Sequence, residues 1–174
     1  MLIVNKKLSI YLIYCLLPFV MFKNVAADTE QYRLKALTNL EALSENAKNK
    51  NLPLLLIFTT HDCPFCERVK DDYIRPMLIS GEYKNKVIIR EVPLNSYNYY
   101  QTKTQDKVPA KQLARHFKVP FYPVIIFTDS EYCELSERII GFNTPSLYGG
   151  RIDLAIDESI SKLNTNQNRF CGIN

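Results

Sequence analysis

The sequence lacks any long run of one charge. Its 174 residues include 22 Lys and Arg against 18 Asp and Glu, without the basic run or arginine-rich stripe that is typical of nucleic-acid binding. We therefore expect no nucleic-acid partner. Internal repeats and an interdomain linker are absent as well, and this length suits one domain.

Metal-ligating side chains are scarce. The two histidines are His61 and His116, and the CxxC pattern occurs once, at Cys63 and Cys66. A structural zinc site needs four such ligands at suitable spacing. We therefore expect neither a metal nor a cofactor. A metal carrier that uses Cys63, Cys66 and His61 stays open as an alternative.

Residues 1–27 have the pattern of a secretory signal peptide. Two lysines precede an uncharged apolar stretch at residues 8–22, and Val25 and Ala27 are the small residues expected before a cleavage site. The stretch is shorter than the ~20 residues of a membrane-spanning helix, and Pro18 interrupts it. We predict export to a bacterial periplasm, with an uncleaved anchor as the alternative.

Cleavage leaves a domain at residues 28–163 and a polar tail at residues 164–174. Disulfides persist in the oxidising compartment to which export leads. Four cysteines stay in the mature chain: Cys63, Cys66, Cys133 and Cys171. They allow three pairings into two disulfides.

Hydrophobic periodicity predicts alternating helices and strands. Helical spacing predicts helices over residues 29–49, 64–75, 110–117 and 145–163. Short apolar runs predict strands over residues 54–60, 86–94, 123–128 and 138–142. The first strands alternate with helices, which implies parallel pairing, and the last two read as a hairpin.

Proline and glycine predict where some of these elements end. Pro76 is expected to kink or end the helix that starts at residue 64. The Gly149-Gly150 pair could delay the last helix to Arg151. Residues 95–107 are polar and are expected to form a loop.

The segment Cys63-Pro64-Phe65-Cys66 directly follows the first apolar strand and opens a helix. The unpaired N–H groups and the dipole at a helix N-terminus stabilise an anion, which lowers the pKa of Cys63 and populates its nucleophilic thiolate. Cys66, one turn further, is expected to be more buried and to resolve the mixed disulfide formed at Cys63. A redox pair is therefore favoured over a structural disulfide.

Three segments resemble the thioredoxin superfamily: LPLLLIFTTHDCPFC at 52–66, LARHFKVPFYPVIIF at 113–127 and RIIGF at 138–142. The resemblance covers most of residues 30–163 and favours the exported bacterial thioredoxin-related proteins called SoxW-like. It implies an α/β thioredoxin fold, with a central mixed sheet of about four strands and helices on both faces. It also implies a monomeric thiol–disulfide oxidoreductase that acts on protein substrates and exchanges electrons with a membrane redox donor or oxidant. A non-enzymatic binding module is the alternative.

The resemblance also implies which residues meet the substrate. The family has a cis-proline opposite the CxxC, and that position falls on Pro123, with Tyr122 offering its backbone. Pro64 and Phe65 complete the expected substrate-binding set. Since only about 5% of X–Pro bonds are cis, a trans proline at the start of a strand is the alternative for Pro123.

Two residues depart from the family pattern. Ile57 stands where thioredoxins bury an aspartate, which removes a proton acceptor for Cys66. Asp62 stands where they have a tryptophan, and its charge disfavours the Cys63 thiolate. His61 could offset this charge if protonated. The direction of electron flow therefore stays open.

The family topology implies a second disulfide. It places the turn that carries Cys133 and the tail that carries Cys171 at the end of the sheet away from the CxxC. Two free thiols, or an auxiliary pair that exchanges with the centre, are the alternatives. A separate cluster, Tyr97, Tyr99 and Tyr100, is either a partner-binding edge or ordinary packing.

Overall fold

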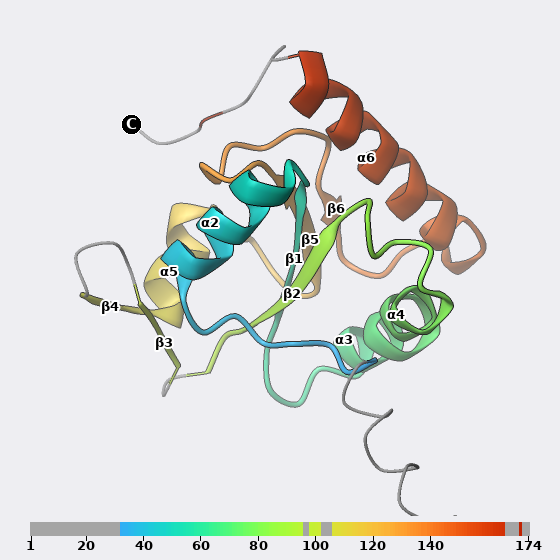
Figure 1. Cartoon of the computed structure of the whole chain (residues 1–174). Coiled ribbons are helices and arrows are strands. Elements are labelled where there is room, and N and C mark those ends of the chain that lie inside the picture. The colour runs from blue at the N-terminus through green and yellow to red at the C-terminus, as the bar shows by residue number, and fades with distance from the viewer. Residues whose placement is uncertain (1–31, 96–97, 102–105, 166–170, 172–174) are drawn as a thin grey trace, which may run out of the picture. The chain divides into compact units, whose positions relative to one another are not determined.

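The computed structural model describes residues 32–95, 98–101, 106–165 and 171 (Figure 1). The expected signal peptide at residues 1–27, Tyr97 and most of the tail lie outside the described residues. The compact unit described below begins at Leu34. Within the described ranges, no helix is both long and apolar enough to cross a membrane.

A four-stranded mixed sheet forms the centre of the unit, in the order β2-β1-β5-β6. The strands are β1 (Leu54–Thr59), β2 (Ile88–Pro93), β5 (Val124–Thr128) and β6 (Ile139–Ile140). β1 pairs with β2 in parallel and with β5 antiparallel, and β5 and β6 form the expected hairpin. The predicted mixed sheet is therefore confirmed.

The expectation of parallel pairing holds for β1 and β2 but is wrong for β5. Phe58, near the end of β1, lies beside Val124, the first residue of β5. The chain leaves β2 and enters β5 at the same end of the sheet, because the single short helix between them does not carry it to the other end. β5 therefore starts where β1 and β2 finish.

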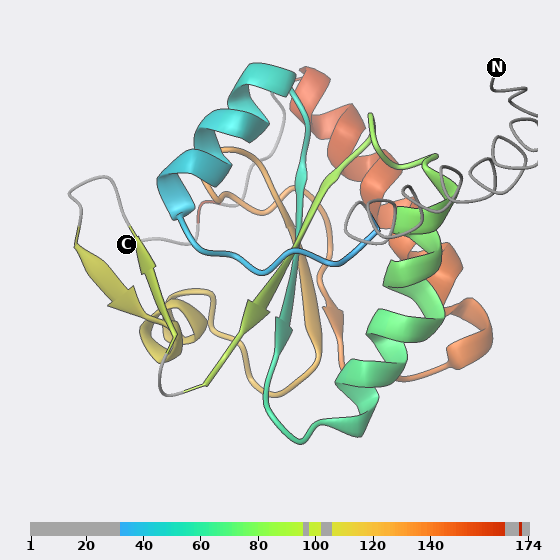
Figure 2. The ribbon, with the colours of Figure 1, turned by 60° about the horizontal axis from the view of Figure 1, so that its bottom comes forward.

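Helices cover both faces of the sheet, as predicted (Figures 1 and 2). One face carries α2 (Leu40–Lys50) and α5 (Ala110–His116). The other carries α6 (Pro145–Thr165) and a continuous helical run made of α3 (Pro64–Val69), the π-helical turn η2 (Lys70–Ile74) and α4 (Arg75–Ser80). Gly149 and Gly150 lie inside α6, so the delayed start at Arg151 is wrong.

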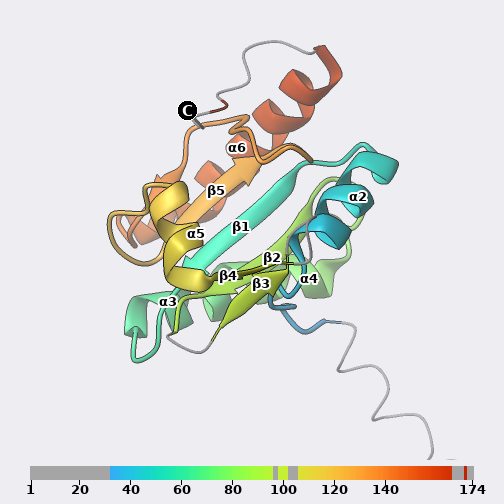
Figure 3. The same ribbon diagram turned by 90° about the vertical axis from the view of Figure 1, so that its left-hand side faces the viewer.

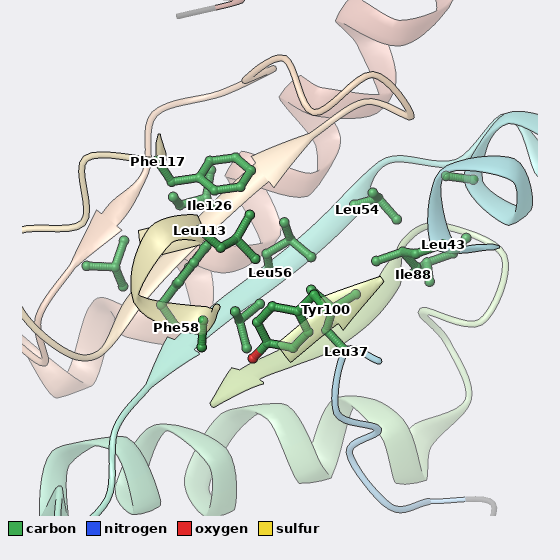
Figure 4. Packing of buried hydrophobic residues seen from close by; sticks show 14 residues of the cluster. Leu37, Leu43, Leu54, Leu56, Phe58, Ile88, Tyr100, Leu113, Phe117 and Ile126 are labelled. Atoms are coloured by element: carbon green, nitrogen blue, oxygen red, sulfur yellow. The ribbon is translucent and has the colours of Figure 1, made fainter. Parts of the chain in front are cut away.

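Every residue of β1 is buried, since helices pack on both sides of it. Side chains alternate between the faces of a strand, so Leu54, Leu56 and Phe58 belong to the core under α2 and α5 (Figure 4). Leu55 and Ile57 belong to the core under α6 and the α3–α4 run. Each such side chain stabilises the fold by about 1.5–3 kcal/mol. These two cores fix the end of β1, from which the CxxC segment extends.

The first helix is shorter than the sequence predicts, beginning at Leu40 rather than near residue 29. Asn39 caps it, since its side chain accepts a hydrogen bond from the Ala42 N–H at 2.9 Å. The residues before the cap run beside β2, where the Leu37 N–H donates to the Glu91 carbonyl oxygen at 2.7 Å. Pairing with the open edge of β2 replaces helix over this stretch.

The helix after the CxxC passes through Pro76, so the expectation that it ends there is wrong. The π turn at Lys70–Ile74 precedes the proline, and the Arg75 N–H donates to the Lys70 carbonyl oxygen. Proline lacks an N–H and crowds the preceding turn, and the wider π turn tolerates both effects. The helix ends at Ser80, where Gly81 has a left-handed φ of 72°.

The stretch expected to be a loop contains a small antiparallel hairpin of β3 (Tyr99–Gln101) and β4 (Lys107–Pro109) next to α5 (Figure 3). Tyr100 of β3 points into the core and donates to the Pro93 carbonyl oxygen at 2.9 Å, whereas Tyr99 is 53% exposed. Tyr100 therefore serves packing.

Candidate active site

The Cys63–Cys66 pair lies where β1 ends and the helical run begins. Cys63 is the N-cap of α3, with extended backbone angles, and Pro64 occupies the first turn, where no N–H is needed. The Cys66 N–H points at Cys63 Sγ at 3.2 Å. The two residues are joined as a disulfide with Cα atoms 5.3 Å apart. Once reduced, this donor would stabilise a thiolate at Cys63.

The two sulfurs differ in accessibility. Cys66 is fully buried, as expected, and Cys63 is half-buried. A substrate sulfur can therefore reach Cys63 first, while Cys66 is held back for an intramolecular step.

His61 and Asp62 precede the pair on an open turn. Their side chains are 87% and 91% exposed, with His61 Nε2 3.7 Å from Asp62 Oδ1. Asp62 has a φ of 53°, a left-handed conformation that aspartate tolerates better than most residues. Water screens the contact between two side chains as exposed as these, so the contact is weak.

The loop before β5 lies at the same end of the sheet as Cys63. The Tyr122–Pro123 peptide bond is cis, which is the isomer that the resemblance implies. Pro123 is buried and Tyr122 is half-buried. The Gly141 N–H donates to the Pro123 carbonyl oxygen at 2.8 Å, which ties this loop to the end of β6.

Aromatic side chains surround this end of the molecule. Phe65 and Phe121 are each 55% exposed. The Phe65 ring lies 6.1 Å from that of Phe142, and the Arg68 guanidinium lies over the Phe142 ring at 4.7 Å. Phe121 lies against Gly141. We refer to Phe65, Phe121 and Phe142 as the aromatic rim.

A charged cluster lies between the ends of β1 and β2 and the helical run that carries Cys66. Glu91 Oε1 accepts hydrogen bonds from Thr59 Oγ1 at 2.8 Å and from Lys70 Nζ at 3.2 Å, and Lys70 also pairs with Glu67 at 2.8 Å. Burial alone lowers the pKa of Lys70, but the hydrogen bonds and charges of Glu67 and Glu91 together raise it above its ordinary value. We refer to Thr59, Lys70 and Glu91 as the charged cluster.

The other two cysteines lie at the opposite end of the sheet, where Thr128 at the end of β5 pairs with Leu54 at the start of β1. Cys133 is buried, Cys171 is exposed, and the structure joins them by a disulfide. The Cys133 N–H donates to the Asp129 carboxylate at 3.0 Å.

Among the described residues, the side chains that come close enough to share a metal ion are Asp129, Glu131 and Cys133. This group is remote from the CxxC, and its sulfur is part of a disulfide. His61 lies beside Asp62 and is not grouped with the two active-site cysteines. The donor set needed by the metal-carrier alternative is therefore not assembled in the described residues.

Sequence reasoning missed the contributions of Phe121, Phe142, Lys70 and Glu91. Phe121 and Phe142 belong to segments that were already recognised, but their gathering at one rim depends on the pairing of β5 with β6. The available signal for Glu91 was a charged residue within an apolar strand. The available signal for Lys70 was a lysine one helical turn after Cys66.

Comparison with known proteins assigns the fold. The model of the thioredoxin-like domain family matches residues 40–148, more than half of the chain. No curated protein matches significantly. Among solved structures, the DsbH oxidoreductase is similar with a TM-score of 0.52 and 18% identity, over 72% of this chain and 86% of that one.

Two thioredoxins are similar at lower scores. Thioredoxin from Trichomonas vaginalis gives a TM-score of 0.47 at 16% identity, over 74% of this chain and 97% of its own. Thioredoxin f from spinach chloroplast gives 0.49 at 15% identity, over 72% of this chain and 93% of its own. The family match, together with the Cys63–Cys66 pair at a strand-to-helix junction, shows that the chain belongs to the thioredoxin-like family and is a thiol–disulfide oxidoreductase.

Proposed function

We propose that the protein is an exported, periplasmic oxidoreductase that exchanges its Cys63–Cys66 disulfide or dithiol with the cysteines of protein substrates. The observation that carries this proposal is the unequal exposure of the two sulfurs at the start of α3. A bulky partner can form a mixed disulfide with half-buried Cys63 but not with buried Cys66.

The exchange balances as a two-electron transfer. In the reducing direction, the Cys63 thiolate attacks a substrate disulfide, and one substrate sulfur leaves as a thiolate. Cys66 loses its proton and attacks Cys63 Sγ, which forms the intramolecular disulfide and releases the second substrate sulfur. The substrate gains two electrons and the protein loses two. The oxidising direction is the reverse sequence.

The surface around Cys63 suits a protein substrate. Pro64, Phe65, Tyr122 and Pro123 are the proposed substrate-binding residues, and the exposed Phe121 of the aromatic rim extends this surface. Tyr122 offers backbone groups to an extended peptide, and the exposed rings offer apolar contact area. A small disulfide needs far less of this surface than a protein does.

Export is supported by the charged start, apolar stretch and small residues of positions 1–27. A disulfide between Cys133 and Cys171, remote from the active site, also suits an oxidising compartment. In that compartment a membrane thiol donor returns Cys63 and Cys66 to the dithiol in the reducing direction. A membrane oxidant returns them to the disulfide in the oxidising direction. We propose that the protein works as a monomer.

A thiol-trapping redox titration tests the proposal. The wild-type protein should show a reversible Cys63–Cys66 couple, and Cys66→Ser should accumulate mixed disulfides with periplasmic proteins. Cys63→Ser is the matched control, because it keeps one thiol but loses the accessible one, and it should trap nothing. An unreducible Cys63–Cys66 bond would instead favour a binding module, and stoichiometric metal binding lost in His61→Ala would favour a carrier.

A further inference from the structure

We propose that Glu91 accepts the proton of the Cys66 thiol and thereby performs the task left vacant at Ile57. This inference rests on the proposed function, since it concerns the step in which Cys66 resolves a mixed disulfide. Glu91 lies on β2, whereas thioredoxins carry their buried aspartate at the position of Ile57 on β1.

Strand register places Glu91 beside the missing carboxylate. Ile57 of β1 and Glu91 of β2 are paired residues in the parallel ladder. Ile89 belongs to the core under the α3–α4 run, and side chains alternate along a strand. Glu91, two residues later, therefore points to the same face as Ile57, and this is the face that carries the helix with Cys66.

The carboxylate is held in place and shielded. Thr59 is buried and donates to Glu91 Oε1, and Lys70 Nζ reaches the same oxygen from the helix. The Glu91 side chain is 17% exposed and that of Lys70 is 21% exposed. Thr59 of β1 and Lys70 of the helical run therefore hold the Glu91 carboxylate between the sheet and the helix.

The cluster is linked directly to the turn that carries Cys66. Lys70 follows Cys66 by one helical turn, and its backbone N–H donates to the Cys66 carbonyl oxygen. Cys66 is fully buried, so its thiol cannot pass a proton directly to bulk water. Glu91, which is paired with Ile57 and is 17% exposed, is the acceptor that we assign to this proton, and its exposure gives the proton an exit to solvent.

Other charged or titratable groups lie on the elements around Glu91, although Tyr100 packs in the core on the opposite face of the sheet. Lys70 and Glu67 come from the helical run, and Tyr100 comes from β3. Burial and the charge of Glu91 both raise the pKa of Tyr100, so this phenol stays protonated near neutral pH. On the segment beside β2 the charged side chain is Lys35, which is exposed. Lys70 places a positive charge 3.2 Å from Glu91 Oε1, on the side of the carboxylate that faces the helical run.

In the proposed step the proton moves from Cys66 Sγ to a Glu91 carboxylate oxygen. The Cys66 thiolate attacks Cys63 Sγ, the new S–S bond forms, and the substrate sulfur leaves with the electron pair of the broken bond. Glu91 then releases the proton to solvent. Cys66 and Cys63 are oxidised together, and the substrate is reduced.

The test follows both steps with the reduced wild-type protein and excess 5,5′-dithiobis(2-nitrobenzoic acid) in a stopped-flow instrument. The first thionitrobenzoate is released when Cys63 attacks, and the second when Cys66 resolves. In Glu91→Gln we expect the second release to slow at least ~10-fold at pH 7, with the first unchanged. We also expect the acidic inflection in the pH profile of the second release to disappear.

Two variants separate this role from a structural one. Glu91→Asp keeps a carboxylate and should keep the inflection, whereas Glu67→Gln removes the more exposed partner of Lys70 and should leave both releases unchanged. A normal second release with an unchanged pH profile in Glu91→Gln would overturn this inference alone. The absence of both releases from wild type would overturn the proposed function as well.

Discussion

Gly141 lies directly against the ring of Phe121: a β-carbon at position 141 would stand 3.1 Å from Phe121 Cε2. Gly141 also has a left-handed φ of 72°, and its N–H holds the carbonyl oxygen of Pro123. One residue without a side chain thus supports both the aromatic rim and the proline loop.

Gly141→Ala should therefore reduce both stability and exchange with protein substrates. The left-handed conformation costs an alanine about 1–2 kcal/mol, and the new methyl group displaces Phe121. Chemical denaturation and kcat/KM measure the two effects. Gly150→Ala is the matched control. Nothing lies within 4 Å of its added β-carbon, and alanine within α6 should stabilise the protein by about 0.5–1 kcal/mol.

Phe65→Ala should slow exchange with protein disulfides much more than exchange with small disulfides. The exposed ring adds apolar contact for a protein partner, while the sulfur chemistry of Cys63 does not depend on it. We expect kcat/KM to fall about 10-fold for a protein disulfide and to change less than about 2-fold for a small aromatic disulfide, since ~1.4 kcal/mol of lost contact corresponds to tenfold. Equal losses on both substrates would show that Phe65 acts on the cysteines instead. Leu154→Ala, at an exposed position on α6, is the control.

Removal of the second disulfide should affect stability and leave the reaction intact. The paired substitution Cys133→Ala with Cys171→Ala opens a loop of 38 residues and should cost about 2–4 kcal/mol in the free energy of unfolding. The thionitrobenzoate release rates of Cys63 and Cys66 should stay at wild-type values. A folded variant with slowed release would instead indicate an auxiliary pair that exchanges with the centre.

Tyr83 makes part of the protein's stability decrease as pH rises through the alkaline range. Its phenol donates to Asp153 at 2.6 Å, and this hydrogen bond, with burial and nearby carboxylates, raises the pKa of Tyr83 to about 12 from its ordinary value near 10. The unfolded phenol ionises first. The stabilisation is therefore complete below pH ~10 and is lost as pH rises towards 12.

Tyr83→Phe removes this hydrogen bond and its titration. Its free energy of unfolding should fall less steeply between pH 10 and 12 than that of wild type, as measured by denaturant titration at each pH. Burial also raises the pKa of Tyr100, Tyr132 and Tyr148, so the variant keeps part of the slope. An unchanged slope would contradict the role of Tyr83. Tyr99→Phe, at an exposed position, is the control.

The sequence predicted best what depends on neighbouring residues along the chain. The strand ending at Thr59 and the helix opening at Pro64 are set by an apolar run, a turn and a first-turn proline. The order of Cys63 before Cys66 then dictates which sulfur is accessible. The local pattern also predicted the hairpin of β5 and β6, and the resemblance supplied the mixed central sheet and the cis isomer at Pro123.

The features that the sequence did not predict depend on contacts between distant segments. Residues 34–38 have apolar spacing that also suits a helix, but the open edge of β2 competes for their backbone groups. Pro76 is a helix breaker in isolation, but the π turn before it buries Ile74 and places the Tyr73 ring 4.9 Å from that of Tyr148 on α6. Glu91 gained its significance only when register placed it beside Ile57.

The two disulfides at opposite ends of the sheet allow the electrons of each chain to be counted. Each disulfide takes up two electrons, so complete reduction consumes four per chain, while one catalytic cycle moves only two. A coulometric titration should therefore give two steps of equal size. The step that a protein substrate can reverse belongs to Cys63 and Cys66. The other step belongs to Cys133 and Cys171, and its midpoint gives the reduction potential at which that disulfide opens.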